Sequence, residues 1–242
     1  MFPFPTTPPY MIVSSLEIVS HAVSHESTSL TLPSGLLAGD LLVVLRSCNH
    51  SAPSAVPSGW TLAHSYGNAN GIFTDNGAAI SYRVVEDASE SSDVVSGWSG
   101  PSDKSGSVCY VLRANIPISS VAVQGAYGSA GSGGTGNPTV AASSSSAFTV
   151  TLAAMGILGR NATSDPRGTS TNFGVFRDAA GGTDPISGSQ NYFAGEWDST
   201  EDDHSGCVGY AICQDPESAV NIYVDNSAGN VSSLVTCYLE VS

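Results

Sequence analysis

The chain has 242 residues, of which 41% are hydrophobic and only 12% charged, and its formal net charge is −14. Such an acidic surface repels phosphate backbones and anionic lipid head groups, so nucleic acids and membranes are excluded as expected partners. With 26 glycines, 13 prolines and a polar surface built mostly from Ser, Thr, Asn and Gly, strands and turns are favoured over helices. We therefore expect an all-β protein with a helix content below about 10%.

Residues 1–10 (MFPFPTTPPY) form a proline-rich arm. Its four prolines fix φ and remove backbone donors, so an extended path is expected. The arm also carries Phe2, Phe4 and Tyr10, and three aromatic side chains on an extended segment are rarely left in water. Two interpretations stay open: the arm folds back on its own domain, or it docks on a neighbouring subunit. It lacks the basic flank and apolar core of a signal peptide, so synthesis in the cytoplasm is expected.

Strand signals separated by turn residues recur from residue 11 onward, a pattern typical of a sandwich or barrel. Residues 41–45 (LLVVL) are a continuous apolar run, which predicts a strand covered on both faces. Alternating apolar and polar residues predict further strands at 80–84, 108–113, 148–152, 208–212, 220–224 and 235–241. We expect one domain over 11–242. The Gly/Ser-rich stretch 125–146 is either a junction between two halves or a long surface loop.

The cysteines show neither a CxxC pair nor metal-ligand spacing, and their odd number argues against a fully paired disulfide framework. They are Cys48, Cys109, Cys207, Cys213 and Cys237. All except Cys48 lie in apolar strand-like runs, where a thiol behaves as a small hydrophobe. We predict reduced cysteines and a fold that needs neither disulfide nor metal.

No arrangement of residues predicts catalysis or cofactor binding. The GxGxxG match at 131–136 is followed by Asn137-Pro138 and a strand pattern, whereas a dinucleotide site requires a helix N-terminus there. His21 and His25 would share a metal only on a helix, which this segment does not resemble. No Ser/His/Asp arrangement can be assembled from the scattered histidines. We expect no enzymatic activity, no catalytic residue and no cofactor.

The densest charge cluster is the acidic run 196–203. Carboxylate oxygens suit Ca²⁺, but the spacing is not that of an EF-hand loop, so a solvated loop is preferred and no metal site is assigned. Tyr192 and Trp197 place aromatic rings beside polar groups, as sugar-binding surfaces do, and mark a candidate glycan surface. Trp60 and Trp98 are expected in the core.

Five motifs occur in order between residues 36 and 115: GDLLV at 39–43, PSGWTL at 57–62, YRV at 82–84, WSG at 98–100 and YVLR at 110–113. In this order they resemble a β-sandwich, jelly-roll-like module of tailed-bacteriophage virion proteins and their prophage-encoded relatives. Within PSGWTL, Pro57 presets a turn, Gly59 closes it, and Trp60 is expected to enter the core beside the GDLLV strand.

The resemblance implies a non-enzymatic accessory structural protein on the virion surface, made in the host cytoplasm and bound to other virion proteins. A capsid decoration or cement subunit is the first interpretation, because the chain shows no coiled coil or repetitive shaft. A tail-fibre or tail-tip protein that binds the host surface is the second, and a lectin-like carbohydrate-binding module is the third. A homo-oligomer is expected, with a trimer as one candidate. The expected fold is an all-β, jelly-roll-like antiparallel β-sandwich with an extended N-terminal arm.

Overall fold

A computed structural model describes residues 13, 15–25, 27–48, 53–68, 76–99, 105–129, 140–141, 151–161, 176–177, 192–193, 204–213, 221–224 and 231–242. Within these ranges the protein is all-β, as expected: every strand pair is antiparallel, and the only helical element is the short 3₁₀ turn η1 (Ala88–Glu90). No helix in the described part is long and apolar enough to cross a membrane.

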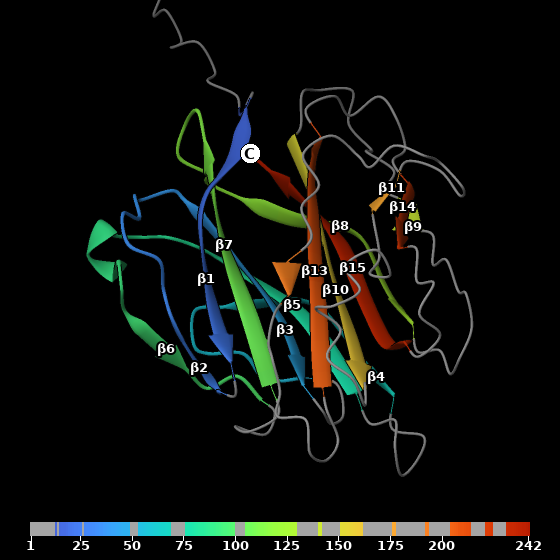
Figure 1. Cartoon of the computed structure of the whole chain (residues 1–242). Coiled ribbons are helices and arrows are strands. Elements are labelled where there is room, and N and C mark those ends of the chain that lie inside the picture. The colour runs from blue at the N-terminus through green and yellow to red at the C-terminus, as the bar shows by residue number, and fades with distance from the viewer. Residues whose placement is uncertain are drawn as a thin grey trace, which may run out of the picture.

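Two five-stranded sheets form most of the described structure (Figure 1). The N-terminal sheet, in the order β1-β7-β3-β5-β4, consists of β1 (Leu16–His25), β3 (Leu41–Cys48), β4 (Thr61–Asn68), β5 (Asn76–Val84) and β7 (Ser105–Ala114). The C-terminal sheet, in the order β12-β13-β10-β15-β8, consists of β8 (Val121–Ser129), β10 (Thr151–Asn161), β12 (Tyr192–Phe193), β13 (His204–Cys213) and β15 (Val231–Val241). Two smaller sheets pair β2 (Ser29–Thr31) with β6 (Val94–Ser96), and β14 (Asn221–Val224) with β11 (Phe176–Arg177) and β9 (Val140–Ala141).

Each large sheet is drawn from one half of the chain. Along the described strands, the chain passes from the N-terminal to the C-terminal sheet once, between β7 and β8. In a jelly roll, two Greek keys are distributed over both sheets, so jelly-roll connectivity is not confirmed by these strands. Residues 125–129, which begin the Gly/Ser-rich stretch 125–146, belong to β8.

One face of the N-terminal sheet, here called the inner face, shares its hydrophobic core with β15. Alternate residues of the central strands are fully buried there, together with alternate residues of the C-terminal strand. The cluster includes Leu41, Val43 and Leu45 of β3, Ile80 of β5, Val108, Tyr110 and Leu112 of β7, and Val235, Cys237, Leu239 and Val241 of β15. The alternation in residues 108–113 and 235–241 thus predicted these buried faces correctly.

The opposite, outer face of the same sheet has a second core. Leu42 and Val44 of β3 pack there with Cys109 and Val111 of β7. The segments that connect the strands cover them and contribute Leu30, Leu32, Leu36, Trp60, Val85 and Trp98. Because residues 41–48 are buried without exception, the prediction of a strand covered on both faces is confirmed.

Candidate functional site

The PSGWTL motif forms the predicted turn on the outer face. The backbone N–H of Trp60 donates to the carbonyl oxygen of Pro57 at 3.1 Å, and Gly59 has a φ of 82°, which a residue with a Cβ rarely adopts. The turn delivers the Trp60 side chain into the outer core, where it packs in the same cluster as Leu42 and Val44 of the GDLLV strand. The predicted placement of Trp60 is therefore confirmed.

The two tryptophans connect three of the motifs. The rings of Trp60 and Trp98 lie edge to face, with centroids 5.3 Å apart and an interplanar angle of 69°, a geometry that aromatic pairs prefer. The indole N–H of Trp98 donates to Ser81 Oγ at 3.4 Å, so the WSG motif is held against the strand that continues into YRV. Both tryptophans are buried, as expected.

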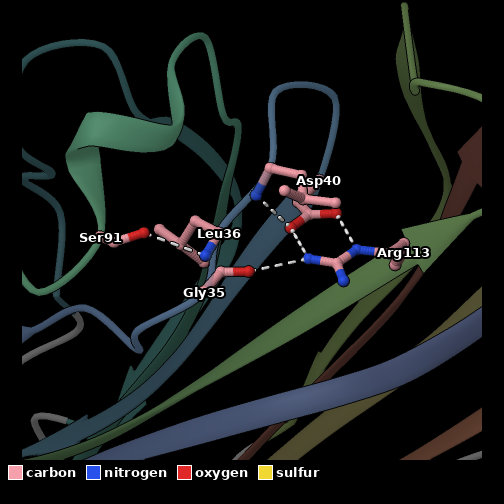
Figure 2. Close-up of polar contacts among 6 residues, drawn as sticks. Gly35, Leu36, Asp40, Ser91 and Arg113 are labelled. Carbon is pink, nitrogen blue, oxygen red and sulfur yellow. Dashed lines mark hydrogen bonds and ion pairs between the residues drawn. The ribbon is translucent and has the colours of Figure 1, made fainter.

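Asp40 and Arg113 join the first motif to the last (Figure 2). Arg113 Nε donates to Asp40 Oδ1 at 2.8 Å and its NH2 group to Asp40 Oδ2 at 2.7 Å, a two-pronged contact between residues 73 positions apart. The hydrogen bond to Asp40 raises the pKa of Arg113. The carboxylate of Asp40 is buried, whereas the side chain of Arg113 is partly exposed to solvent.

The same carboxylate organises the loop before β3. Its Oδ2 atom also accepts from the backbone N–H of Leu37 at 2.8 Å, while Arg113 donates to the carbonyl of Gly35 at 3.0 Å. A neighbouring bond, from the N–H of Leu36 to Ser91 Oγ at 3.0 Å, ties this loop to the segment after η1. All of these bonds are formed within the chain, so Asp40 of the GDLLV motif has a structural role: it fixes the loop before β3 and connects it to β7.

Arg46 is the largest fully buried polar side chain described, and sequence analysis did not identify it. Its guanidinium donates to the carbonyls of Ser99 at 3.1 Å and Ser27 at 3.0 Å, and to the hydroxyls of Ser107 at 2.9 Å and Ser105 at 2.6 Å. Among the described residues no carboxylate lies within ion-pair distance of it. Burial accordingly lowers the pKa of Arg46.

This hydrogen-bond set makes Arg46 a cross-link between connecting segments. Ser99 is itself bonded to the residues beside PSGWTL: its hydroxyl accepts from the N–H groups of Ser54 and Ala55 at 2.9 and 3.1 Å. One guanidinium therefore joins β3 to β7, to the turn after β1 and to the WSG motif. The only signal in the sequence is an arginine that directly follows an apolar run.

Glu90 completes the outer layer at η1. It forms an ion pair with Arg83 of the YRV motif and accepts at Oε1 from the N–H groups of Glu86 and Asp87, at 2.9 and 3.1 Å. Asp87 in turn accepts from the N–H of Ser89 at 2.8 Å, and hydrogen bonding with Ser89 lowers the pKa of Asp87. The bond from the N–H of Asp87 to Glu90 belongs to a capping box at the start of η1. Arg46, Arg83 and Arg113, the arginines whose side chains are described, thus all donate within the chain.

The described thiols and histidines form no reactive cluster. Cys109 and Cys237 are free and buried, and burial raises the pKa of both, to about 12 for Cys237. Cys48, unexpectedly, ends β3 and is buried as well. His21 and His25 lie four residues apart on β1, about 13 Å along a strand, too far to share a metal. The described ranges contain no group of three or more residues that could hold a metal ion.

The residues singled out for partner or glycan binding fall mostly beyond the described ranges. Phe2, Phe4, Tyr10 and Trp197 lie outside them. Tyr192 begins β12, where its backbone pairs with Val208 of β13. The comparisons with known proteins give no relative: no family model matches the chain, and neither a curated protein nor a solved structure does.

Proposed function

We propose that this chain is a non-enzymatic accessory structural protein on the outer surface of a tailed-bacteriophage virion, with capsid decoration as its role. The observation that supports the proposal is that each of the five motifs contributes at least one side chain to the layer on the outer face of the N-terminal sheet: Asp40 and Leu42, Trp60, Arg83, Trp98, and Val111 with Arg113. Residues up to 73 positions apart meet there through the tryptophan pair, the Asp40–Arg113 contact and the Arg46 cross-links.

The chemistry of this layer favours a framework over a ligand site. Asp40, Arg83 and Arg113, the charged residues of the motifs, are engaged with other parts of the chain. The indole N–H of Trp60 is buried and has no acceptor among the described residues. Motifs whose polar groups bond to one another specify a rigid module, which is what a subunit on a particle surface requires.

The finer architecture belongs to the same proposal. The shared core of β15 with β3, β5 and β7 supports a two-layered β-sandwich, in which the two large sheets cover each other. The arm at residues 1–10, with Phe2, Phe4 and Tyr10, would then extend from this body and dock on another virion subunit. The net charge of −14 would keep the outward surface soluble.

The test is to locate the protein in particles. Phage particles produced from the host that carries this gene are purified, separated into heads and tails, and analysed by mass spectrometry with stoichiometry. Capsid decoration predicts recovery with the heads at many copies per particle. Recovery with the tails would favour the tail-fibre alternative, and absence from both would contradict the proposal. A saturable glycan-binding curve that Trp197→Ala abolishes would instead favour the lectin-like alternative.

A further inference from the structure

Among the described strands, the short strand β6 is paired along one edge only, with β2. Its register with β2 places Thr31 opposite Val94 and Leu30 opposite Val95. The N–H of Leu32 donates to the carbonyl of Asp93 at 2.8 Å, so the pair 32/93 is a hydrogen-bonded one. Hydrogen-bonded and non-hydrogen-bonded pairs alternate along an antiparallel ladder, which makes Leu30/Val95 hydrogen-bonded and leaves Val94 and Ser96 facing away from β2.

Val94 and Ser96 therefore direct their N–H and C=O groups to the open edge of the ribbon. Among the described residues, none forms a backbone hydrogen bond with this edge, because β6 pairs with β2 alone. The side chains of the two residues are exposed, and Val94, at 68%, is the most exposed large hydrophobic residue described. By contrast, Val95 between them packs against the outer core. An open strand edge with an exposed apolar side chain is a template for an added strand.

The proline pattern of the arm matches what such an edge can accept. In an added strand, only every second residue faces its neighbour, and only those residues need an N–H group. The arm alternates Phe2-Pro3-Phe4-Pro5, so the residues that retain an N–H are two apart and the prolines fall between them. Proline is tolerated in an edge strand where its missing N–H would face solvent. An arm strand with this pattern can form backbone hydrogen bonds along one of its edges only. On β6, Val94 and Ser96 direct their backbone groups to the open edge and can pair with it.

We propose that residues 1–5 of a second copy of this chain add to the open edge of β6, with Phe2 and Phe4 facing Val94 and Ser96. One phenylalanine then lies opposite Val94, and aromatic and β-branched residues are a favourable cross-strand pair. Pro3 and Pro5 point away from β6. The inference rests on the proposed docking role of the arm and names the surface on which it docks.

The symmetry of this contact follows from its two unlike surfaces. The arm of one copy meets the β6 edge of the next, so the contact is heterologous and closes as a ring or as a reciprocal exchange between two copies. The trimer that the sequence suggested is one such ring. Because each contact is small, we expect association to require a closed ring or a reciprocal pair, and to increase with protein concentration.

The experiment measures the full-length chain by sedimentation equilibrium, and amide hydrogen exchange at Val94 and Ser96, across a concentration series. We expect a concentration-dependent oligomer in which both amides become at least tenfold slower to exchange than in the dilute protein. Val94→Pro removes the facing N–H without removing a β2 bond and should weaken association at least tenfold. Val94→Ala removes the exposed side chain that faces a phenylalanine and should also weaken association, whereas the matched control Val23→Ala, at another exposed valine, should leave association unchanged.

Two arm variants keep the test decisive if Val94→Pro fails to fold. Phe4→Pro removes a facing N–H and should abolish association, whereas Pro5→Ala adds an N–H that points away and should preserve it. A monomer at all concentrations would overturn the inference, and so would an oligomer insensitive to both proline variants. Protection of Val94 and Ser96 in a monomer would place the arm on its own domain and overturn the second-copy contact. If these results appear while arm deletion still removes the protein from particles, the proposed function stands and only the docking surface is wrong.

Discussion

The two faces of the N-terminal sheet are both buried, but they are held in different ways. The inner face packs aliphatic side chains against alternate residues of β15, and shape and apolar burial dominate there. The outer face is covered by connecting segments, which have backbone groups to satisfy and are fixed by tryptophans, serines and arginines. Side chains of all five sequence motifs, from Asp40 to Arg113, therefore take part in closing the outer face.

Substitutions at two adjacent residues of β3 test the difference between the two faces directly. Leu45 faces the inner core and Arg46 the outer layer, and both are fully buried. Leu45→Met conserves volume and should cost less than about 1.5 kcal/mol of unfolding free energy. Arg46→Met removes the donor from the Ser99 carbonyl and from the Ser105 and Ser107 hydroxyls, while the Ser27 carbonyl keeps its bond from the Ser105 hydroxyl, and should cost about 3–5 kcal/mol. Urea unfolding of both variants is the measurement, and equal losses would contradict the difference between the faces.

Two glycines of the loop before β3, Gly39 and Gly35, test how tightly this loop packs against the connection between the two sheets. Gly39 has a φ of 87°, and a Cβ there would lie 2.5 Å from Pro117 Cβ in the β7–β8 connection. Gly39→Ala should therefore cost about 2–4 kcal/mol, from strain and from displacement of that connection. Gly35 has a φ of 75° and open space, so Gly35→Ala should cost about 1–2 kcal/mol. Thermal melts of the pair test this, and the reverse order would show that the close approach is not constraining.

The Asp40–Arg113 contact should have a smaller effect, because Arg113 is partly exposed and solvent screens it. Asp40→Asn keeps the acceptor for the N–H of Leu37 but loses the charge, and we expect a loss of about 1 kcal/mol. Arg113→Lys should behave similarly, since a lysine cannot reproduce the two-pronged geometry. A double-mutant cycle measures the coupling, and additive effects would mean that the contact contributes nothing.

The smallest expected effect is a pH dependence at His64 on β4. Partial burial lowers the pKa of His64 below its usual value of 6.5. The unfolded chain then binds a proton more readily than the folded one, so stability is lost as pH falls through about 6.5. The unfolding midpoint of the wild type should fall slightly more between pH 7.5 and 5 than that of His64→Gln. Parallel curves for the two proteins would rule out a contribution from His64.

Local sequence patterns predicted several of the strands, but not the features of the structure that depend on long-range contacts. Alternation located the buried faces around residues 108–113 and 235–241, and the PSGW turn was correctly placed, because each depends on neighbours in sequence. The partners of Arg46 are 19 to 61 residues away and come from three other segments, so no local pattern indicates them. The open edge of β6 depends on the order of strands in space, which alternation does not encode. Residues 1–10 and Trp197 stay predictions.

The most direct test of the whole account is deletion of residues 1–10, measured in two ways on the same protein. We expect a melting temperature within a few degrees of the wild type, because the two described cores are built from side chains of the strands and of the segments that connect them. We also expect that the truncated protein is lost from purified particles that carry the wild type at full occupancy. Full occupancy of the truncated protein, or its failure to fold, would contradict the account of a self-sufficient framework with a docking arm.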